Sequence, residues 1–176
     1  MKETKTLVKK AKKGDHEAFI QLIENYEVVL YNMARRFLKE ERDIEDALQE
    51  TILNAYQNLH QLKKNRYFYT WLCRIMMNQC KQYLRKEEWF EEIEENTWVE
   101  EPTFTETQEL NALIQQLSQR YRIPIVLYFY NGFSIKEIAE ILAEPTGTIK
   151  SKLSRGKKLL FEMYEKQEGV DQHGTV

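Results

Sequence analysis

The chain has 176 residues, 42% of them hydrophobic, and a net charge of −2. This length suits one ordinary domain or two small ones, and six glycines and three prolines leave little room for a loop-rich β architecture. Two cysteines are too few for a disulfide framework, and a charged start without any long apolar run argues against export and membrane insertion, so we expect a cytoplasmic protein.

Charge is distributed unevenly along the chain. Residues 1–86 hold 17 Lys and Arg against 11 Asp and Glu, and residues 110–176 hold nine against seven. Between them, residues 87–109 carry ten glutamates and no basic residue. We therefore predict an all-α protein in which two small helical domains, 1–86 and 110–168, flank a flexible acidic linker at 87–109, with a disordered tail at 169–176.

The first domain reads as a series of helices. Gly14 is expected to end a short Lys-rich helix, and Asp15 to cap the next one. Apolar residues at helical spacing over 18–37 predict one long amphipathic helix. Asp43 is expected to cap a third helix, and a fourth is predicted over about 68–86.

The two cysteines lie seven residues apart in the predicted fourth helix. Helix rise places Cys73 and Cys80 about 10 Å apart, which is too far for a disulfide bond. We expect both to be small buried hydrophobic residues. The alternative is a metal pair, but no histidine or further cysteine lies near them in the sequence.

The second domain contains a helix-turn-helix pattern. Ser134 and Glu137 have the spacing of a capping box, which predicts a short helix. A second helix is expected to open at Thr146 or Thr148 and to run to about residue 164. A glycine in mid-helix, Gly156, is costly, so we expect it to pack closely against the first helix of the pair.

The second helix of this pair has the composition of a DNA-reading helix. Its N-terminal half is polar and basic, with short side chains that permit close approach to a major groove. The residues expected to contact DNA are Thr148, Lys150, Ser151, Ser154, Arg155 and Lys157. The alternative is a pair of surface helices whose charges are simply solvated.

The first domain presents two candidate surfaces on separate helices. Spacings of three, four and seven residues place four side chains on one polar, acidic face of a helix: Asp46, Gln49, Glu50 and Leu53. Such a face suits a basic protein partner; the alternative is an ordinary solvated face. Basic and aromatic residues further along fit single-stranded nucleic acid, unless the aromatic rings belong to the core. These residues are Lys63, Lys64, Asn65, Arg66, Tyr67, Trp71, Arg74, Asn78, Lys81 and Arg85.

Four segments in this order resemble the extracytoplasmic-function sigma factors, the smallest class of the sigma-70 family of bacterial RNA polymerase subunits. The segments are 14–19, 43–51, 68–75 with Asn78 and Arg85, and 134–140 through 147–156. The resemblance covers nearly the whole chain. Ala143 stands where the family usually has glycine and Gly156 where it usually has alanine, and Pro124 is expected to kink its helix.

The resemblance implies a role for each surface. The acidic face would dock on the large clamp subunit of core RNA polymerase, the basic and aromatic surface would capture the −10 element as a single strand, and the helix-turn-helix would read the −35 element. It also implies contact with the polymerase flap and control by an anti-sigma factor, usually a membrane protein. The residues themselves form no nucleophile–base pair, metal site or phosphate loop, so neither an enzyme nor a cofactor is expected.

Two other functions fit parts of the sequence. A conventional helix-turn-helix repressor or activator would use residues 1–86 for dimerisation or ligand binding and would bind duplex DNA tightly on its own. A helical adaptor would bind only protein and would show no promoter selectivity.

Overall fold

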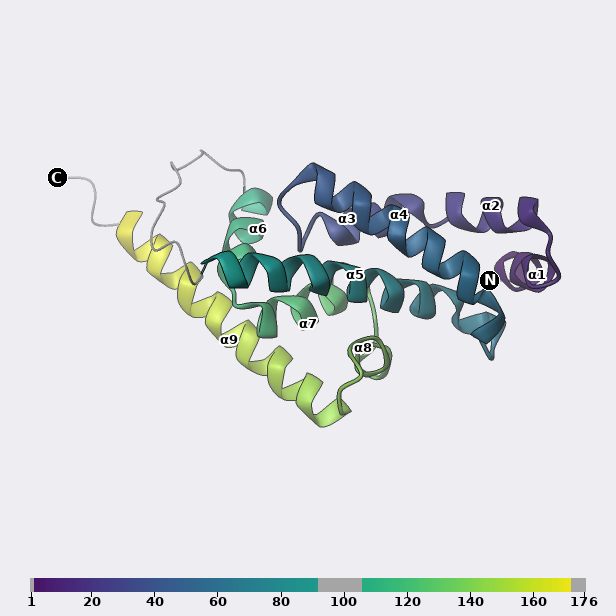
Figure 1. Ribbon diagram of the computed structural model, residues 1–176. Helices are drawn as coiled ribbons and strands as arrows, with labels where there is room; N and C mark the ends of the chain where they lie inside the picture. Colours follow the sequence, from purple (N-terminus) through teal and green to yellow (C-terminus); the bar gives the residue numbers. More distant parts are fainter. Residues whose placement is uncertain (1, 92–105, 172–176) are drawn as a thin grey trace. The chain divides into compact units, whose positions relative to one another are not determined.

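The fold is all-α, as the sequence predicts (Figure 1). The computed structural model describes the backbone of residues 2–91 and 106–171, and the side chains of residues 3–84 and 110–166. All regular structure in these ranges is helical. The chain divides into two units, Met1–Glu95 and Asn96–Val176. The predicted linker, 87–109, spans the division, but helix continues to Glu91 and begins again at Glu106, so both of its ends are helical. The predicted tail, 169–176, likewise begins as helix, which runs to Asp171. Residues 92–105 and 172–176 fall outside the described residues.

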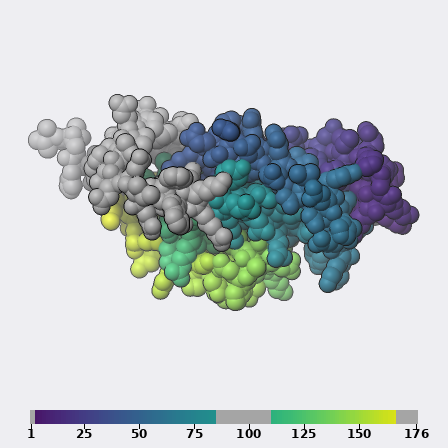
Figure 2. Space-filling model, viewed as in Figure 1, coloured from purple at the N-terminus to yellow at the C-terminus, as the bar shows by residue number. Residues whose placement is uncertain are grey.

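The first unit contains the helices that carry two of the candidate surfaces. They are α1 (Lys2–Ala11), α2 (His16–Glu24), α3 (Glu27–Ala34), α4 (Glu41–Asn58), η1 (Leu59–Gln61), η2 (Asn65–Tyr67) and α5 (Phe68–Glu91). Asp15 caps α2 as predicted, since its carboxylate accepts a hydrogen bond of 3.0 Å from the Ala18 amide. The helix α1 closes one end of this unit, where it packs on α2 and η2 (Figure 2).

The single long helix predicted over 18–37 is wrong, because the chain breaks between α2 and α3. Asn25 ends α2, and Tyr26 leaves helical geometry with φ −122° and ψ −9°. The break lets the Tyr26 ring stack on Tyr69 of α5 at 5.3 Å while Leu22 and Leu30 on either side stay fully buried. Apolar spacing survives such a break, so periodicity alone could not reveal it.

The predicted cap of the third helix is also wrong. The helix α4 begins at Glu41, with Glu40 as its N-cap, and Asp43 lies inside its first turn. Carboxylates at this end of a helix stabilise it through the macrodipole, so Glu41 and Asp43 favour the start without a side-chain cap.

The core of the first unit forms chiefly where α4 packs on α5. Burial is complete or nearly so along one side of α5, at Phe68, Leu72, Cys73, Met76, Met77, Cys80 and Leu84. From α4, Thr51 is fully buried and its hydroxyl donates to the Ala47 carbonyl at 2.7 Å, which satisfies the polar group within its own helix.

The two cysteines are free and buried, as predicted. Burial raises the pKa of each thiol, at Cys73 and at Cys80, to about 12. The thiolate fraction at about pH 8 should therefore fall by roughly a thousandfold relative to an exposed thiol. We expect a thiol reagent such as DTNB to label the folded protein at least about 100-fold more slowly than the protein in denaturing guanidinium chloride. Equal labelling rates in the two conditions would contradict the buried placement.

The second unit contains α6 (Glu106–Gln116), α7 (Gln119–Phe129), α8 (Ile135–Leu142) and α9 (Thr146–Asp171). The predicted capping box is present: the Glu137 amide donates to Ser134 Oγ at 3.3 Å, and the Ser134 amide donates to the Glu137 carboxylate at 2.9 Å. The helix α9 begins at Thr146, one of the two predicted starts, and continues to Asp171, past the predicted end. Pro124 lies inside α7, which continues through it.

The turn of the helix-turn-helix is made by Ala143. It adopts the left-handed conformation with φ 55°, and it is the only non-glycine residue with positive φ among those described. Glycine takes this conformation without steric cost, whereas alanine at this position carries a small backbone strain. Three residues separate the end of α8 at Leu142 from the start of α9 at Thr146, and Figure 1 shows α8 end-on while α9 runs across the view.

Gly156 packs closely, but against a different helix from the one predicted. A Cβ at this position would lie 3.0 Å from Ile125 Cγ1 and 3.4 Å from Tyr121 Cβ, both on α7. Gly156 thus sets how closely α9 approaches α7, whereas we predicted contact with α8.

A larger side chain at Gly156 is expected to destabilise the second unit. We expect Gly156→Leu to lower the free energy of unfolding by about 1–3 kcal/mol, because the new side chain must displace Ile125. Urea unfolding followed by circular dichroism measures the change. Lys158→Leu, at an exposed position of the same helix, is the control, and an equal loss in both variants would show that close packing is not the cause.

Candidate nucleic-acid and protein interfaces

The acidic face predicted on α4 is accessible. Gln49 and Glu50 are exposed, Leu53 is 50% exposed, and the Asp46 side chain is 48% exposed. Asp46 lies 4.0 Å from the Arg42 guanidinium, which is itself 90% exposed, so the pair is weak and leaves the carboxylate available. A half-exposed leucine among acidic and amide groups gives this face both charge and an apolar contact point.

The acidic face extends onto α5 through Tyr83, which sequence reasoning missed. Burial, followed by the nearby carboxylates of Asp46, Asp43 and Glu50, raises the pKa of the Tyr83 phenol. A phenol with its ordinary pKa is already neutral at physiological pH, so this upward shift leaves Tyr83 as a neutral hydroxyl near the α4 carboxylates. Only the packing of α4 on α5 brings these groups together, and no spacing in the sequence indicates it.

The predicted basic loop leads into the short helix η2. Lys63, Lys64 and Arg66 are exposed, and Asn65 is partly covered. The Arg66 guanidinium donates to the Tyr67 hydroxyl at 2.8 Å and lies over its ring, 4.6 Å from the centroid. One face of the 40% exposed Tyr67 ring is thus occupied by a cation.

Of the aromatic residues at positions 67–71, which end η2 and begin α5, only Tyr67 presents a large exposed ring. Phe68 is fully buried, and Tyr69 stacks on Tyr26 at 5.3 Å. Trp71 is partly exposed and contacts Phe68, with ring centroids 6.0 Å apart. The alternative that some rings belong to the core is therefore right for Phe68, and only Tyr67 and the exposed part of Trp71 are accessible to a ligand.

The basic face of α5 follows the predicted order. Arg74 and Asn78 are exposed one turn apart, and Lys81 is partly exposed one turn further on. Arg85 lies in α5, but its side chain is outside the described residues. The side chains of Arg74, Asn78 and Lys81 lie on the side of the helix away from the buried core residues, so this part of α5 divides into a core side and a polar, basic side.

The N-terminal half of α9 presents most of the predicted DNA-contacting residues. Lys150, Ser151, Ser154, Arg155 and Lys157 are exposed, and Thr148 is partly covered. Ile149 and Leu153 are buried on the opposite side, where they fix the helix to the unit. The exposed residues include three cations, Lys150, Arg155 and Lys157, and two serines, a composition that suits readout of base edges in a major groove.

Two further contacts of α9 could not be read from the sequence. The Lys152 ammonium lies 2.6 Å from the Glu144 carboxylate, which ties α9 to the turn that precedes it. The Lys157 ammonium lies 5.1 Å from the centroid of the Phe129 ring of α7. Lys152 therefore braces the turn, and Lys157 has a preferred position beside Phe129 before any DNA is bound.

The described residues contain neither a cluster of three or more potential metal ligands nor a helix long and apolar enough to cross a membrane.

The chain matches two families of known protein segments. Residues 22–90 match the family described as Sigma-70 region 2, and residues 107–160 match Sigma-70, region 4. The first match contains both the acidic face of α4 and the basic face of α5, and the second contains the helix-turn-helix.

Whole-length relatives and solved structures agree with these matches. The ECF RNA polymerase sigma factor SigW of Bacillus subtilis (strain 168) is 32% identical, over 89% of this chain and 94% of that protein. The RNA polymerase sigma-H factor of Pseudomonas aeruginosa is 27% identical, over 88% and 90%. The fold resembles CnrH in complex with the cytosolic domain of CnrY, with a TM-score of 0.72 and 24% identity over 93% and 97%. It also resembles RpoE of Bartonella quintana in complex with the anti-sigma factor NepR, with a TM-score of 0.69 and 23% identity over 84% and 96%. The chain belongs to the ECF RNA polymerase sigma factors of the sigma-70 family.

Proposed function

We propose that this sigma factor binds core RNA polymerase through its first unit and directs it to promoters of a specific set of genes. The observation that carries the proposal is the placement of different surfaces on the two units. An acidic face and a basic surface with accessible aromatic rings lie on the first unit, and a helix-turn-helix with an exposed polar helix lies on the second. The chain itself performs no bond chemistry in this role, and it acts in the cytoplasm, where polymerase is found.

Docking on polymerase would use the α4 face. Asp46 and Glu50 supply negative charge toward a basic surface of the large clamp subunit, and Leu53 supplies an apolar anchor. The Asp46 side chain is 48% exposed and Glu50 is exposed. Binding removes water from both carboxylates, and this loss is compensated only where a cation of the partner takes the place of that water. Charge complementarity would thus select the partner, and the leucine would add buried apolar area.

Promoter opening would use the surface formed by residues 63–67 and α5. Separating the DNA strands costs free energy, and capture of unstacked bases offsets this cost. Tyr67 and Trp71 offer partly exposed rings, and Arg74, Asn78 and Lys81 follow as charged or amide groups that suit the sugar-phosphate backbone. The −10 element would be read in this way as a single strand.

Recognition of the −35 element would use the exposed side of α9. Arg155 is suited to guanine in bidentate fashion, Ser151 and Ser154 allow close approach, and lysines on either side engage phosphates. Each reading surface is small, so each should bind weakly alone. Polymerase would hold the two units at a fixed span, with the second unit in contact with its flap. The affinities of the two reading surfaces would then combine through effective concentration.

Control by an anti-sigma factor is the second part of the proposal. Two solved proteins of the same fold were captured in complexes, CnrH with the cytosolic domain of CnrY and RpoE with the anti-sigma factor NepR. A partner that covers the α4 face or the exposed side of α9 would block polymerase or promoter binding. Such a partner can itself be a membrane protein, while this chain inserts into no membrane in the proposed role.

Run-off transcription with core RNA polymerase over a library of promoter sequences tests the proposal. We expect the purified protein to confer selective initiation on a subset with common −35 and −10 sequences. A gel shift without polymerase is the companion experiment, because a conventional repressor or activator would bind duplex DNA tightly alone, whereas this protein should bind it weakly. Transcription without promoter selectivity would instead favour a protein-binding adaptor.

A further inference from the structure

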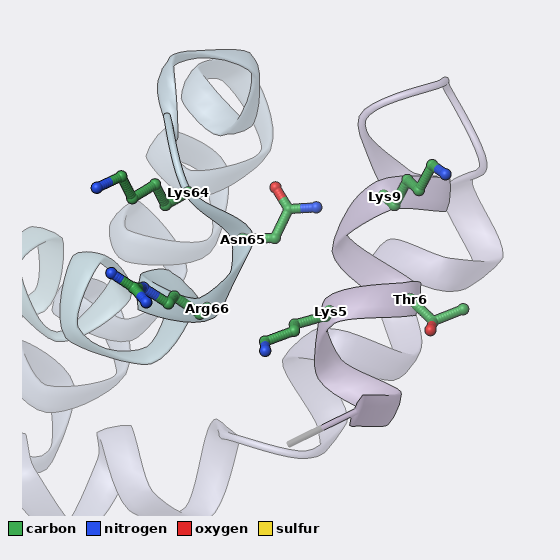
Figure 3. A pocket seen from close by; sticks show the side chains of 6 residues that line it. All are labelled: Lys5, Thr6, Lys9, Lys64, Asn65 and Arg66. Carbon is green, nitrogen blue, oxygen red and sulfur yellow. The ribbon is translucent and has the colours of Figure 1, made fainter.

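A basic hollow lies between α1 and η2 of the first unit. Its volume is about 790 Å³, and it is lined by Lys5, Thr6, Lys9, Lys64, Asn65 and Arg66 (Figure 3). Four of these six residues are cationic at neutral pH and none is acidic. The hollow brings together residues about sixty positions apart in the sequence. Sequence analysis indicated the basic residues 64–66 but gave no sign that Lys5 and Lys9 lie beside them.

The cations of the hollow are spread out and do not converge on one point. Lys5 and Asn65 extend into the gap between the two elements, whereas Lys64 and Arg66 extend away on the η2 side and Lys9 on the α1 side (Figure 3). A small anion needs donors directed at a single position. Separated cations around the rim of an open hollow instead suit a chain of phosphates, in which successive charges are spaced along a backbone.

The two walls of the hollow are held in place by contacts within the unit. The helix α1 packs on η2, and the Lys12 ammonium of the turn after α1 donates a hydrogen bond to the Leu62 carbonyl before the loop. On the other wall, Arg66 is fixed over the Tyr67 ring at 4.6 Å. A binding surface that is already ordered loses less conformational entropy when its ligand arrives.

We infer that this hollow binds the sugar-phosphate backbone of single-stranded DNA next to the bases captured at Tyr67. The inference rests on the proposed function and adds Lys5 and Lys9 of α1 to the strand-capture surface. The Arg66–Tyr67 pair links the two parts, because Tyr67 offers a ring for a base and Arg66 lines the hollow. The strand would pass from the ring along the hollow, with its phosphates following the lysines.

Binding of a labelled oligothymidylate of about 15 nucleotides to the full-length protein tests the inference. Fluorescence anisotropy over a range of salt concentrations gives the affinity and its salt dependence. If Lys5 and Lys9 neutralise about two phosphates, Lys5→Ala/Lys9→Ala should reduce the slope of log K against log salt by about 1.4, and lower the affinity at low salt by roughly tenfold. Lys5→Arg/Lys9→Arg should retain the wild-type slope, since it keeps both charges.

The matched control is Lys10→Ala/Lys13→Ala, which removes the same charge from exposed residues of the same region that do not line the hollow. An equal loss in the control pair would overturn the inference, as would a wild-type protein that does not bind the oligonucleotide at low salt. If wild type bound a duplex of the same length equally well, and the Lys5 and Lys9 variant lost the same affinity for it, the preference for single strands would be overturned. Competition by inorganic phosphate at matched ionic strength would also overturn the inference and indicate a small-anion site. Core polymerase is absent from this assay, so its result is independent of whether the protein directs promoter-specific transcription.

Discussion

Reversing two charges on the α4 face, in the variant Asp46→Lys/Glu50→Lys, is expected to weaken binding to core RNA polymerase by at least about 100-fold. The wild-type carboxylates would face cations of the clamp subunit, so each lysine replaces an attraction by a repulsion across the interface. The two side chains lie one helical turn apart on an accessible surface, so they act on the same patch of the partner. The fold should persist, because neither side chain contributes to the buried core.

Pull-down of core enzyme and competition against a second sigma factor measure this effect. Glu24→Lys/Glu27→Lys is the matched control, because it makes the same change in net charge at exposed positions outside the α4 face. Circular dichroism should show wild-type helix content and a similar thermal midpoint for both variants. If the α4 variant captured core enzyme as well as wild type, docking through this face would be wrong; if both variants lost binding equally, net charge and not the face would be responsible.

Local signals in the sequence predicted the fold where structure is determined locally. The capping box at Ser134 and Glu137 and the cap at Asp15 involve residues three positions apart, so the pattern contains everything that forms them. The break at Tyr26 depends on the Tyr69 ring of a helix far along the chain. The periodicity of apolar residues contains no information about Tyr69, which is distant in the sequence. Periodicity therefore predicted one helix where the structure has two.

For the candidate surfaces too, the sequence predicted what depends on one helix and missed what depends on contacts between helices. Helical spacing correctly predicted that Gln49, Glu50, Arg74, Asn78 and Arg155 are exposed, because exposure follows from the face opposite the apolar stripe. Trp71, Lys81 and Thr148 are only partly exposed. It did not predict the position of Tyr83 beside the α4 carboxylates, the Lys152–Glu144 ion pair or the approach of Gly156 to Ile125. Each of these depends on how one helix crosses another, and small differences in crossing change which side chains meet.

Arg155→Ala is expected to reduce selection at one base pair of the −35 element by about 1–3 kcal/mol, which is about 5- to 150-fold in affinity. Arg155 is exposed on the side of α9 opposite the buried Ile149 and Leu153, so the helix presents its guanidinium outward without rearrangement. Alanine leaves a guanine without its bidentate partner, and any base can then occupy that position at similar free energy. Selection of a randomised −35 element by holoenzyme, followed by sequencing, should show loss of preference at a single position.

Lys157→Ala separates base reading from general attraction to DNA. Lys157 lies beside the Phe129 ring and can reach a phosphate, so its loss should weaken all sequences evenly and reduce the salt slope by about 1, with the preferred sequence unchanged. A loss of preference confined to Arg155→Ala would assign readout to that side chain, because both variants remove one positive charge from the same helix. If Arg155→Ala instead weakened every sequence alike, its guanidinium would contact the backbone, and base selection would depend on other residues of α9 or on the shape of the duplex.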